Sequence, residues 1–136
     1  MNLVSSELMR RVRDSIHDYI YLDELESSLV DTEPYQRMRW IKQLGSANLV
    51  YPGANHTRLE HSIGVSHLVK QMASQSDVPK DEIPLVSIAG LLHDLGHSPY
   101  SHLADELPFG KDHVEFTQDI INSCLLYTSD AADDLL

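Results

Sequence analysis

The chain has 136 residues, which is enough for one domain with a hydrophobic core but hardly for two. Its net charge of −11 argues against broad binding to nucleic acid or to an anionic membrane surface. No apolar run is long enough to cross a bilayer, and the first residues lack the basic-then-apolar order of a signal peptide. We therefore expect a soluble, cytoplasmic protein without a membrane partner or a stable nucleic-acid complex.

Cysteine and basic residues narrow the chemistry further. Cys124 is the only cysteine in the sequence, so an internal disulfide is impossible and any metal must be held by His, Asp or Glu. Most basic residues precede position 59 and predict a positive patch suited to a phosphate chain, although some can equally form a solvated helix face. These residues are Arg10, Arg11, Arg13, Arg37, Arg39, Lys42 and Arg58.

The N-terminal residues predict short elements. Ser5–Arg13 is typical of a short polar helix. Asp14–Leu22 lacks a 3.6-residue period, which favours a short strand or hairpin. Asp23 is a suitable N-cap for a helix over Glu24–Val30, where leucines are spaced four residues apart.

A second helix is predicted after Asp31 or Thr32, because Pro34 then occupies the first turn, where its missing N–H costs nothing. Gly45 is expected to end this helix, and 46–57 to form a loop. The predicted apolar face comprises Tyr35, Met38, Ile41 and Leu44.

The middle of the chain predicts two longer helices. One begins near Arg58, and its expected core-facing stripe places a histidine in line with apolar residues. The other, Ile83–Leu92, is almost wholly apolar, as expected in the middle of a helical bundle, and Gly96 follows its end. The stripe of the first helix is His61, Val65, Leu68 and Met72.

Shorter helical segments complete the fold. Pro99–Glu106 predicts a single helical turn, and Asp112–Ser123 an amphipathic helix. The predicted fold class is therefore all-α, with one short β-hairpin near the N-terminus.

The last residues differ in character from the rest. Residues 124–136 complete no amphipathic pattern, and Cys124–Asp133, when back-translated, resembles the transposon-end adapter used to prepare sequencing libraries. We expect residues 1–123 to be the native N-terminal part of a longer domain and residues 124–136 to be adapter read-through.

A candidate metal site lies across the two longer helices. His61 is on the first, and the adjacent pair His93 and Asp94 ends the second. Imidazole and carboxylate together suit a divalent metal, although these residue types do not distinguish zinc, iron, manganese, cobalt or magnesium. Taken alone, His61 is also consistent with a hydrogen-bonded core histidine, and the His-Asp pair with a helix end that interacts with its own dipole.

The spacing of a single histidine and a His-Asp pair about thirty residues later resembles the HD-domain metal-dependent phosphohydrolases. Three segments, 31–45, 51–65 and 93–102, look like the deoxynucleoside triphosphate triphosphohydrolase branch; the last reads HDLGHSPYSH. The resemblance implies part of an HD-domain helical bundle. It also implies hydrolysis of a deoxynucleoside triphosphate to the nucleoside and triphosphate.

The same resemblance implies roles for individual residues. His61, His93 and Asp94 match three of the four metal ligands of the family, and the fourth, a downstream aspartate, has no counterpart here. Arg58 matches an arginine that contacts phosphate, and Gln43 and Leu44 match positions that approach the sugar. Histidines lining the phosphate channel are matched by His97, His102 and His113.

A catalytic hypothesis follows. Metal bound by the three ligands would generate hydroxide as the nucleophile, and Arg58 would neutralise developing charge. Asp105 follows His102 by three residues and can orient its imidazole on one helical turn, so we expect His102 to protonate the departing 5′ oxygen, with His97 beside it. A non-functional surface pair is the alternative interpretation of His102 and Asp105.

Other functions stay open on the sequence alone. The metal ligands are common to HD phosphohydrolases, so another nucleotidase or phosphodiesterase is one alternative, and a nucleotide-binding regulatory module without turnover is another. We expect residues 1–136 alone to be inactive and the full-length protein to form a homo-oligomer.

Overall fold

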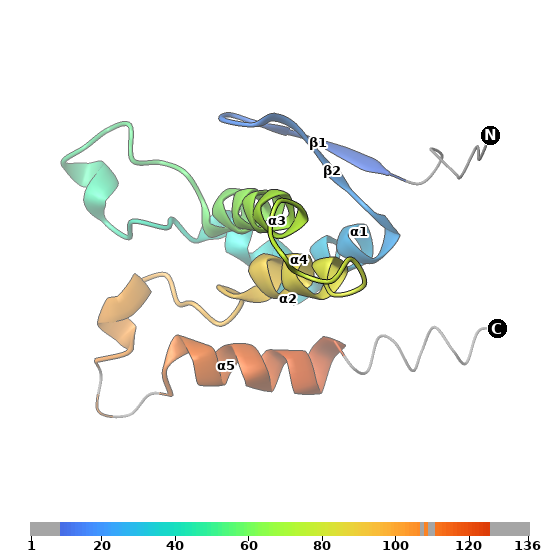
Figure 1. Ribbon diagram of the computed structural model, residues 1–136. Helices are drawn as coiled ribbons and strands as arrows, with labels where there is room; N and C mark the ends of the chain where they lie inside the picture. The colour runs from blue at the N-terminus through green and yellow to red at the C-terminus, as the bar shows by residue number, and fades with distance from the viewer. Residues whose placement is uncertain (1–8, 107, 109–110, 126–136) are drawn as a thin grey trace, which may run out of the picture.

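The computed structural model describes residues 9–106, 108 and 111–125. Helical segments predominate in this part of the chain, and its two strands form one antiparallel hairpin. In Figure 1, helices α3 (Arg58–Ser74) and α4 (Ile83–Leu92) occupy the centre, between the hairpin on one side and α5 (His113–Ile120) on the other. The predicted fold class, mostly α-helical with a short hairpin near the N-terminus, is confirmed.

The hairpin consists of β1 (Arg10–Asp14) and β2 (Asp18–Leu22). Val12 pairs with Ile20 in its register. The helix predicted over Ser5–Arg13 is therefore wrong where it overlaps β1, and residues 5–8 lie outside the described part. Ile20 and Leu22 of β2 are buried against the helices. This packing favours extended structure, and a local sequence pattern does not reveal it.

Helix α1 (Glu24–Val30) is confirmed with its predicted cap. Asp23 accepts a hydrogen bond from the Glu26 N–H, and the Glu26 carboxylate accepts one from the Asp23 N–H, which forms a capping box. Glu26 is only 1% exposed and continues inward, where it contacts Lys70 Nζ at 2.7 Å and Ser87 Oγ at 2.5 Å. This carboxylate therefore ties α1 to both central helices.

The second predicted helix is shorter than expected. α2 (Glu33–Arg37) continues as the 3-10 segment η1 (Met38–Trp40) and stops there, so the extension to Gly45 is wrong. Ile41 is extended, and its carbonyl accepts a hydrogen bond from the Arg58 N–H at 2.8 Å. The hydrogen bond from the start of α3 thus keeps Ile41 extended. Helix periodicity cannot predict this effect, because the two residues are far apart in the sequence.

Helices α3 and α4 pack closely because small residues lie at their contact. A Cβ at Gly90 would lie 3.3 Å from the Ser66 Cα, and Ser66 Oγ is 2.9 Å from Ser87 Oγ. This proximity brings the start of α3 near the end of α4.

The predicted core-facing stripe of α3 is wrong. Leu68 and Met72 are 43% and 67% exposed, respectively. The buried face is offset around the helix because a serine, Ser66, lies at the close contact with α4, and an apolar pattern does not count serine. Buried positions of α3 are Arg58, Leu59, Ser62, Ile63, Ser66 and Ala73.

The remaining elements are short. No described helix is both long and apolar enough to cross a membrane. The helical segments predicted over Pro99–Glu106 and Asp112–Ser123 are present. The residues expected to be adapter read-through, 124–136, lie largely outside the part of the chain that the structure describes. These elements are η2 (Ala47–Leu49), η3 (Ser101–Ala104), α5 and the π-helical η4 (Ile121–Leu125). The core cluster comprises Ile20, Leu22, Val30, Tyr35, Met38, Leu59, Ile63, Leu91, Leu92 and Leu95.

Candidate metal centre and histidine cleft

Three side chains from α3 and the end of α4 converge on one point. His61 Nε2 lies 3.8 Å from Asp94 Oδ2, and His93 Nε2 lies 3.3 Å from Asp94 Oδ1. One ligand atom from each residue falls within 4.8 Å of the other two. We call His61, His93 and Asp94 the metal triad. Their convergence follows from the close packing of α3 on α4.

The protonation pattern of the triad suits a divalent cation. His93 Nδ1 lies 2.7 Å from the Gly90 carbonyl oxygen, so this nitrogen must carry the hydrogen, and Nε2, 3.3 Å from Asp94 Oδ1, is left as the nitrogen that a metal can bind. Burial lowers the pKa of His61, against the opposing effect of Asp94, and favours the neutral ligand form. Two imidazoles and one buried carboxylate thus fit a metal that prefers nitrogen and oxygen ligands.

Arg58 connects the metal triad to a neighbouring cleft. It is only 3% exposed, and its Nη1 donates to Asp94 Oδ2 at 2.6 Å. Its Nη2 donates to the Gln43 carbonyl at 3.3 Å. The Asp94 carboxylate offsets the unfavourable position of the Arg58 cation at the N-terminus of α3. Arg58 and His61 therefore share the Oδ2 side of Asp94, while Oδ1 lies beside His93.

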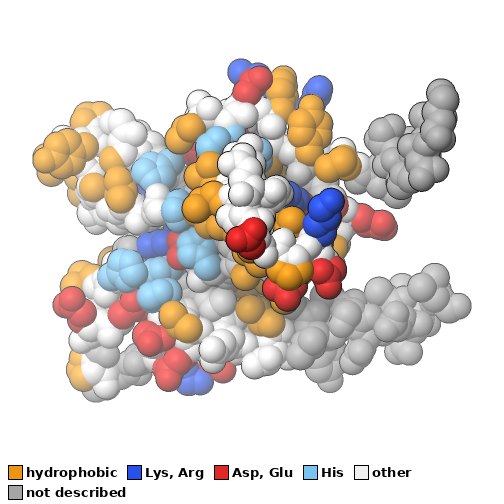
Figure 2. Space-filling view, viewed as in Figure 1, with side chains coloured by type: hydrophobic (Ala, Val, Ile, Leu, Met, Phe, Trp, Pro, Cys, Tyr) orange, Lys and Arg blue, Asp and Glu red, His pale blue; other side chains and the backbone are white. Residues whose placement is uncertain are grey.

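The cleft, of about 460 Å³, opens beside Arg58. The segment after η1 forms one wall and η3 the other, and Figure 2 shows histidines gathered at this hollow between two lobes. Gln43, Leu44 and His102, three residues expected to contact substrate or act in catalysis, line it together. The lining residues are Gln43, Leu44, Gly45, Ser46, Arg58, Tyr100, His102 and Leu103.

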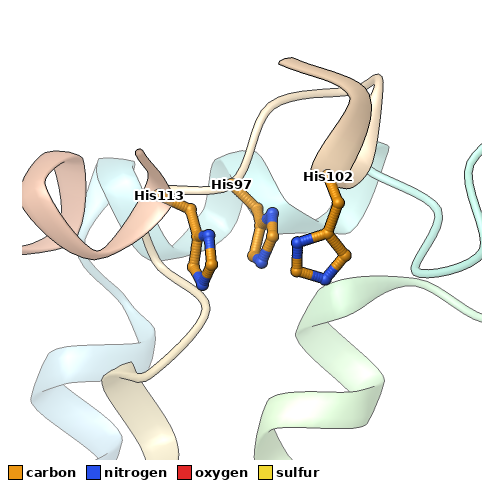
Figure 3. Close-up of side chains that lie close together, drawn as sticks. All are labelled: His97, His102 and His113. Atoms are coloured by element: carbon orange, nitrogen blue, oxygen red, sulfur yellow. The ribbon is translucent and has the colours of Figure 1, made fainter. Parts of the chain in front are cut away.

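Three further histidines from separate segments lie side by side near the cleft (Figure 3), and we call them the histidine cluster. The rings of His97 and His113 stack, with centroids 4.0 Å apart and planes 13° from parallel. His102 meets both edge-on, at 4.9 and 5.2 Å between centroids. The structure thus assembles His97, His102 and His113, which are all expected from the family resemblance to line a phosphate channel.

Asp105 orients two members of the histidine cluster. Its Oδ2 lies 2.8 Å from His113 Nδ1 and 3.2 Å from His102 Nδ1. The hydrogen bond with His113 lowers the pKa of Asp105 most, and that with His102 contributes further. The pairing of His102 with Asp105 was predicted by their spacing, but the shorter contact with His113 was not. Both rings therefore hold hydrogen at Nδ1 and leave Nε2 for other partners.

The histidine cluster is poorly arranged to hold a second metal, although its nitrogen atoms lie within 4.8 Å of one another. Parallel stacked rings cannot both direct in-plane lone pairs at one ion, which excludes shared ligation by His97 and His113 as they lie. Burial, and next the charge of Arg58, lower the pKa of His97 to about 4, so His97 is neutral at pH 7.

Arg37 has a role that the sequence did not reveal. Its Nη2 donates to the carbonyl oxygens of Leu95 and His97, at 2.8 and 2.9 Å. It thereby holds the segment that follows α4 and carries His97. Two other members of the seven-residue basic patch predicted from the sequence have different partners, since Arg39 bonds to Gln36 and Lys42 to Asn55. No local signal identifies this role of Arg37, because its partners are about 60 residues away.

Comparison with known proteins supports this arrangement. The HD domain family matches residues 58–128, which include the metal triad, Arg58 and the histidine cluster. The chain belongs to the HD domain family. The predicted family is therefore confirmed, and this HD domain also has relatives named as deoxynucleoside triphosphate triphosphohydrolases.

Three relatives illustrate the similarity. An uncharacterized protein of Methanocaldococcus jannaschii is 48% identical over 94 residues, which are 69% of this chain and 20% of the relative. The deoxynucleoside triphosphate triphosphohydrolase SAMHD1 of Danio rerio is 46% identical over 112 residues, covering 77% of this chain and 18% of its own. Human SAMHD1 is 38% identical over 122 residues, which are 83% of this chain and 20% of the human protein. This HD domain thus spans about a fifth of the curated relatives.

A solved structure shares the fold. The crystal structure of a hypothetical protein from Aquifex aeolicus superposes with a TM-score of 0.81 at 38% identity, covering 93% of this chain and 34% of the other. This chain therefore shares its fold with about a third of that protein.

Proposed function

We propose that the full-length protein hydrolyses deoxynucleoside triphosphates to deoxynucleoside and triphosphate in a reaction that requires a divalent metal. The observation that carries the proposal is the position of Asp94, which belongs to the metal triad and also pairs with Arg58 in the cleft wall. This residue places a candidate cation site directly beside a candidate phosphate site. The names of the SAMHD1 relatives supply the substrate class.

The metal triad would hold the cation. When bound, a divalent metal supplies a Lewis acid and lowers the pKa of a coordinated water. His93 is prepared for ligation by its bond to the Gly90 carbonyl, and His61 by its lowered pKa.

The cleft residues would bind and orient the substrate. The Arg58 guanidinium is fixed by Asp94, so it can stabilise charge on a phosphoryl oxygen without first being ordered. Gln43 and Leu44 lie on the cleft wall and would contact the sugar, while His113 and His97 would lie along the phosphates.

His102 would supply the proton for the departing 5′ oxygen. Asp105 holds its Nδ1, and its side chain is 71% exposed at the cleft, so Nε2 can carry a proton toward the substrate. Neutral His97 beside it adds no competing positive charge. Asp105 therefore acts as the orienting carboxylate of this proposed acid.

The test is product analysis with the full-length protein. Each deoxynucleoside triphosphate is incubated with protein and a divalent metal, and the products are separated by ion-exchange chromatography. Release of triphosphate supports the proposal. Release of monophosphate or pyrophosphate identifies a different HD nucleotidase or phosphodiesterase, and binding without turnover by metal-loaded protein identifies a regulatory module.

Two further expectations belong to the same proposal. We expect the full-length protein to be a cytoplasmic homo-oligomer, which light scattering and cell fractionation measure. We also expect residues 1–136 to show no turnover, because the family resemblance places a fourth ligand outside them. Hydrolysis by the 136-residue chain would contradict that expectation.

A further inference from the structure

Helix α5 and the segment after α4 touch backbone to backbone at Gly96. A Cβ at this position would lie 2.4 Å from both the His113 carbonyl oxygen and the Thr117 nitrogen, and 2.8 Å from the Phe116 Cβ. Real side chains do not approach so closely, so only glycine permits this contact. The contact packs α5 directly against the segment that carries His97.

Thr117 fastens this contact with its hydroxyl. The side chain is buried, and Oγ1 accepts a hydrogen bond from the Gly96 N–H at 2.8 Å while it donates to the His113 carbonyl at 2.7 Å. A threonine in a helix often donates to the carbonyl four residues earlier, so that bond alone has no special meaning. The bond from Gly96 is different, because it joins two separate segments through a buried hydroxyl.

A chain of contacts leads from this hydroxyl to the proposed acid. His113 is the first residue of α5, and its ring stacks on His97 at 4.0 Å. The same ring holds Asp105 at 2.8 Å, and Asp105 holds His102 at 3.2 Å. These contacts link the placement of α5 on Gly96 to Asp105 and His102.

We propose that Thr117 is a positioning residue: its hydroxyl fixes His113 on His97 and, through Asp105, orients His102. The expected effect on catalysis rests on the proposed function, but the expected effect on the positions of His113 and His102 does not. The hydrogen-bond partners of its hydroxyl, Gly96 and His113, belong neither to the metal triad nor to the cleft lining, so Thr117 acts through other residues.

The kinetic test uses Thr117→Val in the full-length protein, because valine keeps the shape and removes the hydroxyl. Misplacing a catalytic group by about 1 Å can slow a reaction by up to about 100-fold, so we expect kcat to fall at least about ten-fold. Metal content should stay within about two-fold of wild type, since the metal triad is intact, and KM should change less than kcat, because Arg58 and Gln43 keep their places while His97 and His113 shift. Thr117→Ser retains the hydroxyl and should restore kcat.

Thr32→Val is the matched control. Thr32 Oγ1 also donates to a nearby carbonyl, that of Leu29 at 2.7 Å, but it lies between α1 and α2. This variant should keep wild-type kcat even if its melting temperature falls as far as that of Thr117→Val. Wild-type kcat in Thr117→Val, or a Ser variant as slow as the Val variant, would overturn the proposal. If the Val variant does not fold, Thr117→Ala takes its place with the same readouts.

A second measurement is independent of activity. In protein labelled with ¹³C-histidine, stacking gives His97 and His113 ring-proton NMR shifts that depend on their separation. Thr117→Val should move these shifts, Thr117→Ser should not, and the separate His17–His67 pair serves as an internal reference. Shifts that move in protein without triphosphohydrolase activity would refute the proposed function alone. Unmoved shifts together with unchanged kcat in an active enzyme would refute the role of Thr117 alone.

Discussion

Arg58 and Asp94 form a buried ion pair, with Nη1 and Oδ2 2.6 Å apart and side chains 4% and 8% exposed. Their partnership crosses from the first turn of α3 to the end of α4. Because Asp94 also belongs to the metal triad, a bound cation and the arginine would share one carboxylate. The pair is consequently both a structural link between the central helices and the boundary between the two candidate binding sites.

Arg58→Ala should destabilise the metal-free protein more than the metal-loaded protein. Removing one partner of a buried pair typically costs about 3–5 kcal/mol, because the other charge stays buried without compensation. A bound cation would compensate Asp94 in the loaded form and reduce that cost. Urea unfolding with and without saturating metal measures both values. Equal losses in the two forms would show that Asp94 does not contact the metal.

His93→Ala and Asp94→Asn should lower the metal content of the purified protein. Each removes one of three converging ligand atoms, and ligation by the remaining two is much weaker. Elemental analysis after dialysis measures the ratio of metal to protein. His67→Ala is the control, since His67 lies on the same helix as His61 but outside the triad. A full metal complement in His93→Ala would count against the assignment.

His102→Ala should abolish turnover and leave the metal content intact. Loss of a general acid typically reduces kcat by about 10²–10⁴-fold, and the ring and ion-pair partners of His102 are His97, His113 and Asp105, which lie outside the metal triad. Asp105→Asn should have a smaller effect on kcat, because the ring keeps its place beside His97 but loses the carboxylate. Steady-state kinetics and elemental analysis on the same samples check both outcomes. Unchanged turnover in His102→Ala would remove His102 from the mechanism.

Glu26 should contribute stability that is lost in acid. Burial alone would raise the pKa of Glu26, but hydrogen bonds from Lys70, Ser87 and the Asp23 N–H outweigh it, and the pKa is lowered from 4.5. A lowered pKa in the folded state means that the unfolded chain binds the proton more tightly. The contribution of Glu26 is therefore fully present above pH 4.5 and declines as the pH falls through the lower folded value.

Glu26→Gln tests this sign. The variant should lose about 1–3 kcal/mol at neutral pH, because Ser87 and Lys70 keep a weaker partner. Its deficit should shrink as the pH falls below 4.5, where wild type becomes protonated too. Chemical denaturation from pH 7 to pH 3 measures the difference. A deficit that grows in acid would contradict the lowered pKa.

The local features of the sequence were predictable because each depends on residues within one or two turns. Asp23 and Glu26 are close enough in the chain to form their capping box, and the apolar run of α4 predicts a helix without knowledge of its neighbours. Its expected burial is only partly correct, because Leu85 is 68% exposed and the buried residues lie toward the C-terminal end of α4. The convergence of His61, His93 and Asp94 was also predictable. Their two segments come from consecutive long helices, and the family resemblance supplied the pairing.

Only the tertiary structure decided features that join distant residues. Ile41 is extended because Arg58 binds its carbonyl, Arg37 holds a segment about 60 residues away, and α3 buries the face that fits α4. Asp105 contacts His113 because Gly96 admits α5 at backbone distance. Side-chain chemistry and local spacing therefore determine which residues can act and which helices form. The packing of separate helices determines which of those residues meet, since that depends on shape complementarity between parts of the chain that no short pattern contains.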